Sequence, residues 1–153
     1  EWIWNAGGLV VFDPGINALS ILTAIYPGPL HLSRAELSFP ANRDTPIAAD
    51  LEFFSPDGAD VTAQFDWRHE GHQTWDIRVT TDQGEAVLSE GGSKWTIDGV
   101  EQHSGADREY SKLYARFAQL VASSATDVDV SPMRHVADAF TLGKRRAVDP
   151  FDW

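Results

Sequence analysis

Residues 7–17 of the chain are Gly-Gly-Leu-Val-Val-Phe-Asp-Pro-Gly-Ile-Asn, and this stretch decides how the first part of the chain folds. Asp is a favoured N-cap residue and Pro is favoured at the first helical position, so we expect a helix that begins at Pro14 with Asp13 as its cap. The apolar residues that follow recur with helical spacing: Ile16, Leu19, Ile21, Leu22 and Ile25. The stretch therefore predicts a glycine turn that leads into an amphipathic helix.

Two polar residues of this stretch, Asp13 and Asn17, lie four positions apart and therefore on one face of the expected helix. Placed at the start of a helix, a carboxylate and an amide can both face a ligand beyond it. The preference of Asp for the N-cap position explains Asp13 equally well. On the residues alone, the structural and the functional interpretation both stay open.

Beyond a Tyr-Pro-Gly-Pro break at residues 26–29, alternating apolar and polar residues predict a series of strands. The expected strands cover residues 30–39, 47–54, 61–68, 74–81, 85–89 and 94–98. The turn residues 55–58 predict an antiparallel hairpin between the second and third of these strands. Helical periodicity returns at residues 107–123 and 131–142. The order indicates an α+β fold, a mostly antiparallel open sheet of about six strands with helices packed on one face.

The second face of that sheet is expected to be polar with several aromatic residues. Thr62, Gln64 and Asp66 alternate with apolar neighbours, and Trp75 begins a later strand. A polar face of this kind resembles a wet subunit interface as much as a solvated surface. We therefore expect the chain to form a homo-oligomer through the sheet face.

Length and composition limit the function classes. A chain of 153 residues has the size of a single domain, and a net charge of -11 disfavours nucleic acid as a partner. The basic run 144–146 follows a Leu-Gly helix stop and is expected to be a solvated turn. The chain has no cysteine, which fits a reducing compartment such as the cytoplasm, and no apolar run approaches the roughly 20 residues that span a bilayer. We therefore expect no membrane partner.

The histidines do not indicate a metal site. His69 and His72 lack the i, i+4 spacing of a zinc protease helix, and no third ligand is evident, so we expect no metal. His31 and His103 fall at expected strand ends or turns, and His135 is expected on the surface of the last helix. No phosphate loop or Gly-x-Gly-x-x-Gly motif occurs, so the cofactor-binding residues of this chain are unknown.

Tryptophan side chains are a further candidate feature, because indole rings stack on sugar faces and on cofactor rings. Trp2 and Trp4 precede the glycine turn, and Trp75 follows a polar, glycine-containing loop. Core packing explains large aromatic residues as well, and both interpretations remain open.

The stretch at residues 7–17 resembles the glucose-fructose oxidoreductase/inositol dehydrogenase (Gfo/Idh/MocA) family, whose second domain carries a Gly-Gly-x-x-x-x-Asp-x-x-x-His pattern at the start of a helix. The likeness continues through the sheet and the two closing helices, over nearly the whole chain. It implies that residues 1–153 form one C-terminal domain for substrate binding and oligomerisation. It also implies that an N-terminal Rossmann domain, absent from this chain, binds NAD or NADP. The opening of the chain without Met fits a piece of a longer polypeptide.

Where much of that family has His, this chain has Asn17. A neutral amide orients hydroxyl groups but is no proton acceptor near neutral pH, so base catalysis is expected elsewhere. The Asp-x-x-x-Asn form resembles the aldose 1-dehydrogenase branch, which oxidises the anomeric carbon of D-galactose or L-arabinose to a lactone. By that resemblance Asp13 contacts the sugar and helps to remove the anomeric proton, Asn17 holds a neighbouring hydroxyl, and Trp75 lines the pocket.

Three hypotheses about the function of the chain follow. The first is that the chain is the C-terminal part of an NAD(P)-dependent aldose 1-dehydrogenase and is inactive by itself. The second is a non-catalytic regulatory or protein-interaction member of the same superfamily, since Asn17 replaces the usual His. The third is an unrelated sheet-forming interaction domain.

Overall fold

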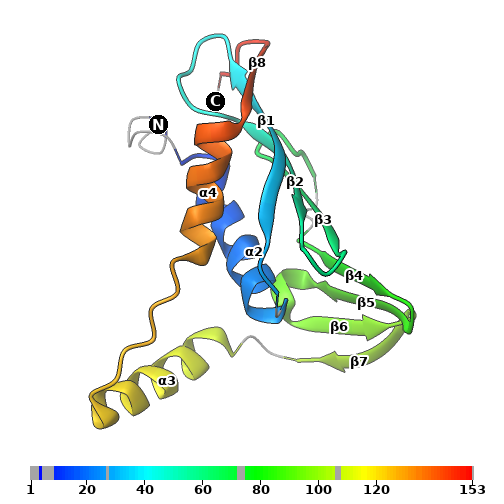
Figure 1. Cartoon of the computed structure of the whole chain (residues 1–153), viewed down its shortest axis with the longest axis vertical. Coiled ribbons are helices and arrows are strands. Elements are labelled where there is room, and N and C mark those ends of the chain that lie inside the picture. The colour runs from blue at the N-terminus through cyan, green and yellow to red at the C-terminus, as the bar shows by residue number, and fades with distance from the viewer. Residues whose placement is uncertain (1–3, 5–8, 27, 72–74, 106–107, 153) are drawn as a thin grey trace. The chain divides into compact units, whose positions relative to one another are not determined.

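A computed structural model of the chain describes residue 4 and residues 9–26, 28–71, 75–105 and 108–152 (Figure 1). The chain divides into two compact units, one of residues 1–69 and 129–153 and the other of residues 70–128. The expectation that residues 1–153 act as one domain stays a prediction. None of the helices in the described part has the length and hydropathy needed to cross a bilayer.

The first unit contains a four-stranded mixed sheet with the order β3-β2-β1-β8. Its strands are β1 (His31–Pro40), β2 (Ala48–Phe54), β3 (Asp60–Asp66) and β8 (Lys144–Val148). The first three strands pair antiparallel, whereas β8 runs parallel to β1. A parallel neighbour requires a crossover, and helix α4 (Ser131–Leu142) directly precedes β8.

Helices α2 (Phe12–Ile25) and α4 pack on one face of this sheet, as Figure 1 shows. The core contains buried residues of both helices and of β1 and β2: Phe12, Leu19, Ala35, Leu37, Leu51, Phe53, Val136 and Ala139. Burial of a large apolar side chain contributes about 1.5–3 kcal/mol to folding. This core fixes the position of α2 against the sheet.

The expected hairpin is confirmed as β2 and β3, which pair from Ala48 with Asp66 to Phe54 with Asp60. The connecting turn includes Gly58 at φ +95°, a backbone conformation that favours glycine. Val61, Ala63 and Phe65 pack toward the helices, while Thr62, Gln64 and Asp66 are exposed.

The basic run 144–146 is not a solvated turn, so that prediction is wrong. It forms most of β8, an edge strand in register with residues 36–38 of β1. Its side chains alternate between the two faces of the sheet: the Arg146 guanidinium lies 3.2 Å from Glu36 Oε1, and the Arg145 guanidinium lies 4.7 Å from the centre of the Phe39 ring. Charged edge strands are common because they oppose unwanted pairing, and here the charges hide the apolar alternation that signals a strand.

The second unit contains an antiparallel four-stranded sheet in the order β4-β5-β6-β7 and helix α3 (Glu109–Ser123). The strands are β4 (Ile77–Thr81), β5 (Gly84–Ser89), β6 (Lys94–Ile97) and β7 (Val100–Ser104), with a short 3-10 helix at Glu90–Gly92 between β5 and β6. The expected meander is confirmed, and β7 is an additional strand that the sequence did not predict, since all of its residues are exposed.

The α+β class predicted from the sequence is confirmed. The strands differ in number and grouping, because the described residues form eight strands in two sheets rather than about six in one. The two extra strands, β7 and β8, are those without an apolar face.

Candidate functional site

The start of α2 differs from the sequence prediction. The helix begins at Phe12 rather than Pro14, with Val11 at the N-cap position and no side-chain cap. The Asp13 amide donates a hydrogen bond to the Leu9 carbonyl at 3.2 Å, so Asp13 lies within the first turn. Val10, Val11 and Phe12 are almost fully buried, and this burial extends the helix toward its N-terminus. The prediction that Asp13 caps the helix is therefore wrong.

Since capping does not use its carboxylate, Asp13 is available for another role. Its side chain is exposed in the first helical turn, where the partial positive charge of the helix N-terminus stabilises an anion. Asn17 follows one turn later and is also exposed. The two side chains share one face of α2. The pair can accept hydrogen bonds from two neighbouring hydroxyl groups, and Asn17 can also donate one.

The opposite face of α2 anchors this pair. Gly15 faces the Phe65 ring of β3 so closely that an added Cβ would lie 3.1 Å from ring carbons. The Phe12 ring packs edge-on to Phe65 at a centroid distance of 6.1 Å and against Phe140 of α4 at 5.3 Å. These contacts hold α2 against both the sheet and α4. The anchored backbone fixes where on α2 the Asp13 and Asn17 side chains begin.

Trp75, the third predicted site residue, belongs to the second unit. It is partly buried and lies just before β4. Its role as a pocket residue stays a prediction.

Other residues singled out in the sequence fall outside the described part of the chain: Trp2, Gly7, Gly8 and His72. Trp4 is described and has a packing role. Its ring lies 6.0 Å from the Phe151 ring, and the Arg43 guanidinium lies 5.3 Å from the ring centre. In the residue ranges that the structure describes, no three His, Cys, Asp or Glu side chains form a group that could hold a metal ion.

His135 is buried rather than on the surface, so that prediction is wrong. Its ring packs edge-on against Phe53 at 5.0 Å, and its Nδ1 has no hydrogen-bond partner in the described part of the chain. Burial lowers the pKa of His135 below its ordinary value, with a smaller opposing effect from Asp138. The buried imidazole is a core group between α4 and β2.

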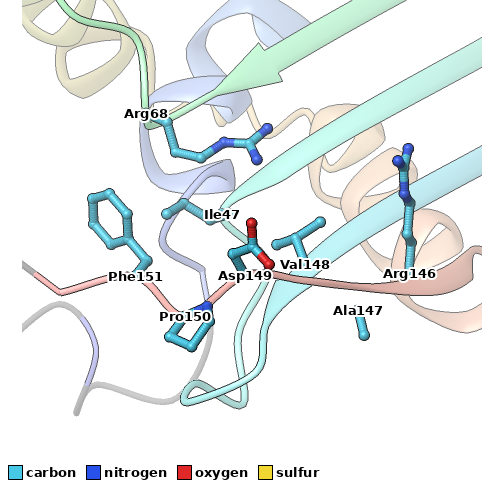
Figure 2. Close-up of a pocket in the computed structure, with 8 residues that line it drawn as sticks. All are labelled: Ile47, Arg68, Arg146, Ala147, Val148, Asp149, Pro150 and Phe151. Atoms are coloured by element: carbon cyan, nitrogen blue, oxygen red, sulfur yellow. The ribbon is translucent and has the colours of Figure 1, made fainter.

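A shallow hollow of about 490 Å³, which the sequence did not indicate, lies beside β8 in the first unit (Figure 2). Arg68 and Arg146 contribute to its wall, together with Asp149 and the apolar side chains of Ile47, Val148 and Phe151. Each arginine already has a carboxylate partner: Arg68 pairs with Asp66 at 2.7 Å and Arg146 with Glu36 at 3.2 Å. The Asp66 partner also raises the pKa of Arg68. These guanidiniums are thus compensated without a ligand.

The far end of α2 is attached by a separate polar contact. The Tyr26 hydroxyl donates a hydrogen bond to Asp57 Oδ1 at 2.5 Å, which raises the pKa of Tyr26 and lowers that of Asp57. The contact joins the end of α2 to the turn between β2 and β3. Both groups thus have a structural role.

No protein-family model matches the chain. Galactose 1-dehydrogenase of Pseudomonas fluorescens is 45% identical over 150 residues, which are 98% of this chain and 49% of that protein. The crystal structure of a D-galactose-1-dehydrogenase protein from Rhizobium etli is 56% identical, with a TM-score of 0.93 over 99% of this chain and 48% of that one. The chain thus spans about half the length of the relatives that it matches.

More distant structures share the fold alone. A 3-ketoreductase from Actinomadura kijaniata, in complex with TDP-benzene and NADP, matches 94% of this chain with a TM-score of 0.73 at 15% identity. The hypothesis of an unrelated interaction domain is wrong, because identities of 45% and 56% extend over nearly the whole chain.

Proposed function

We propose that the chain is the C-terminal, substrate-binding part of an aldose 1-dehydrogenase of the Gfo/Idh/MocA-like oxidoreductase family, because it is similar to two galactose 1-dehydrogenases over nearly its whole length. The whole enzyme oxidises the anomeric carbon of D-galactose, or of the related L-arabinose, to a lactone. The observation that carries this proposal is the match to two galactose 1-dehydrogenases over 98–99% of the chain. Asp13 and Asn17, exposed side by side on an anchored helix, are the groups that support it locally.

The proposed chemistry assigns a role to each of these residues. The Asp13 carboxylate accepts the proton of the anomeric hydroxyl as the C=O bond of the lactone forms. Asn17 holds a neighbouring hydroxyl through its amide and keeps the ring oriented. Trp75 lines the sugar site with an indole face.

NAD or NADP, when bound, accepts the hydride that leaves the anomeric carbon. The sequence contains no glycine-rich phosphate loop, so the dinucleotide is assigned to an N-terminal Rossmann domain in the remainder of the longer polypeptide. That domain is a proposed partner of this chain, and the isolated chain is expected to be inactive.

The test is an assay of the longer polypeptide with D-galactose, L-arabinose and D-glucose, each with NAD and with NADP. We expect reduced nicotinamide and lactone in equal amounts with at least one of the first two sugars. Lack of turnover with every aldose contradicts the proposal. The isolated chain serves as the control that separates sugar binding from hydride transfer.

A non-catalytic role in the same superfamily is the second candidate, and Asn17 in the place of the usual His favours it. In that case the longer polypeptide binds an aldose without reducing the dinucleotide. Calorimetric titration with D-galactose beside the turnover assay distinguishes the two candidates.

We also propose that the chain forms a homo-oligomer through the sheet face opposite α2 and α4. The side chains of that face are polar: Asp50, Glu52, Thr62, Gln64 and Asp66. The edge strand β8 adds Lys144 and Arg146 to the same face. In a dimer with two-fold symmetry, the basic edge of one copy can lie against the acidic β2 of the other, so that opposite charges pair. Light scattering that gives a monomer mass at high concentration contradicts this proposal.

We propose the cytoplasm as the compartment, because a chain of 153 residues without cysteine is suited to reducing conditions. Localisation of a fluorescent fusion of the longer polypeptide tests this.

A further inference from the structure

Helix α2 contains a glycine, Gly15, whose backbone conformation does not require one. The residue lies in the helix two positions after Asp13, and its amide donates a hydrogen bond to the Val11 carbonyl at 3.3 Å. Gly15 is not among the glycines with a positive φ, so an alanine can adopt the same backbone. Glycine within a helix is less stable than alanine because it loses more conformational freedom on folding. The reason for glycine at this position therefore lies in what surrounds it.

The surroundings show a close approach of α2 to strand β3. An added Cβ at Gly15 would lie 3.1 Å from carbons of the Phe65 ring, closer than the 3.4–4 Å of an ordinary contact. The Phe65 ring cannot easily withdraw, because Phe12 packs edge-on to it at 6.1 Å and is itself in contact with Phe140 at 5.3 Å. A side chain at position 15 would therefore displace the helix by a few tenths of an ångström.

The other end of α2 is attached to the same hairpin. The hydroxyl of Tyr26, the residue after the helix, donates a hydrogen bond to Asp57 in the turn between β2 and β3. This contact lies roughly three helical turns from Gly15, about 16 Å at 1.5 Å per residue. With the far end held in this way, a displacement at Gly15 tilts α2 and moves the start of the helix most.

Asp13 lies at that start, in the first turn of α2. Its backbone therefore moves with any tilt of the helix. Proton transfer requires that donor and acceptor come within hydrogen-bond distance, about 2.6–3.2 Å. A misplacement of 1 Å can lower a rate by about 10²-fold, so a shift of a few tenths of an ångström corresponds to about 3- to 10-fold.

We propose that Gly15 and Phe65 are positioning residues for Asp13. The missing side chain at position 15 lets α2 approach β3 to the distance at which the Asp13 carboxylate reaches the anomeric hydroxyl. Neither positioning residue touches the sugar, and both act through the backbone of α2. This inference rests on the proposed function, since it requires the dehydrogenase reaction.

The test is a double-mutant cycle in the longer polypeptide, with kcat and KM measured for D-galactose. Gly15→Ala adds a methyl group against the ring, and Phe65→Leu removes the ring and makes room for that methyl group. The double variant combines the two changes. Ile47→Val is the control for a general loss of stability, because Ile47 is fully buried beside the hollow rather than in the core cluster around α2.

We expect Gly15→Ala to lower kcat about 3- to 10-fold with a smaller change in KM, because it moves the proton acceptor without removing a group that contacts the sugar. Phe65→Leu should lower kcat about 3-fold, since the helix loses the ring against which it rests. The double variant should have the kcat of Phe65→Leu alone, because the added methyl group no longer meets a ring. Ile47→Val should keep both constants.

Three results overturn the proposal. The first is a kcat of Gly15→Ala equal to that of the unsubstituted enzyme. The second is a double variant in which the two losses multiply, since the contact between the two residues then does not cause them. The third is an equal loss of kcat in Ile47→Val, which assigns the effect to stability. If Gly15→Ala does not fold, Phe65→Leu is the deciding variant, and an unchanged kcat in it overturns the proposal.

Failure of this inference is distinguishable from failure of the proposed function. An unsubstituted polypeptide that oxidises no aldose contradicts the proposed function and, with it, the positioning of a catalytic Asp13. Full turnover in both the unsubstituted enzyme and Gly15→Ala contradicts the positioning role alone.

Discussion

Helices α2 and α3 are nearly equal in length, 14 and 15 residues, and both carry an apolar side. Phe12 and Leu19 of α2 are buried at or below 1% exposure, whereas Phe117 of α3 is 63% exposed. The first helix packs on a sheet and on α4 within its own unit, whereas no described residue of the second unit covers the apolar side of α3. Periodicity thus predicts that a helix has an apolar side without predicting what covers it.

The difference also concerns function. Because α2 is packed against Phe65 and Phe140, the backbone that carries Asp13 and Asn17 has a fixed position within the first unit. This anchoring supports the proposal that α2 presents the sugar-binding groups.

The largest expected effect is a difference in the free energy of unfolding between variants in α2 and in α3. Phe12→Ala leaves a cavity among buried rings and should reduce the free energy of unfolding of the isolated chain by about 3–5 kcal/mol. Phe117→Ala removes an exposed ring and should change it by less than about 0.5 kcal/mol. Denaturant unfolding followed by circular dichroism measures both. Similar losses in the two variants would mean that α3 is packed within this chain.

A smaller effect is expected where α2 approaches the sheet. Gly15→Val forces side-chain atoms into the Phe65 ring and should destabilise the chain by about 1–3 kcal/mol. Ser20→Val, on the exposed side of the same helix, should lose only the difference in helix propensity, below about 1 kcal/mol. Equal losses would contradict the close contact between Gly15 and Phe65.

The core shared by α2 and α4 also predicts a pH dependence. The pKa of His135 is lowered in the folded state by burial, so the unfolded chain binds its proton more readily. The contribution to stability is complete above the ordinary His pKa of about 6.5 and decreases as the pH falls through that value toward the lowered one. His135→Leu should remove this decrease from the curve of unfolding free energy against pH. If the unsubstituted chain and His135→Leu lose stability equally as the pH falls, His135 is not the cause of that loss.

The smallest expected effect is on substrate binding. Asn17→Ala in the longer polypeptide removes the neutral hydrogen bond that we propose between Asn17 and the sugar and should raise KM about 3- to 10-fold, with a smaller change in kcat. Ser20→Ala, one turn further along α2, is the control and should leave both constants unchanged. A loss confined to kcat would instead assign Asn17 a direct role in proton transfer.

Much of the fold could be predicted because most strands have one apolar side. The hairpin of β2 and β3 follows from the alternation of Val61, Ala63 and Phe65 and from the turn at Gly58. Strand β8 could not be predicted, because its residues are mostly charged and its pairing with β1 depends on the crossover through α4.

The site residues Asp13, Asn17 and Trp75 stay a prediction, whereas the geometry at the start of α2 differs from the one that the sequence predicts. The cap preference of Asp13 is a local signal, and the burial of Val10, Val11 and Phe12 overrides it by starting the helix earlier. In the same way, His135 is polar by type, yet its position on α4 places it against Phe53. Tertiary packing determines both the start of α2 and the burial of His135. The periodicity of a few residues contains no information on tertiary packing.

The assignment of Asp13 as the proton acceptor is tested most directly by one isosteric substitution in the longer polypeptide. Asp13→Asn preserves shape and removes the negative charge, while Asp60→Asn at the exposed start of β3 is its matched control. We expect kcat/KM for D-galactose to fall about 100-fold or more in the first variant and to remain unchanged in the second. Undiminished turnover in Asp13→Asn would contradict the proposed role of α2 as the helix that carries the active-site carboxylate.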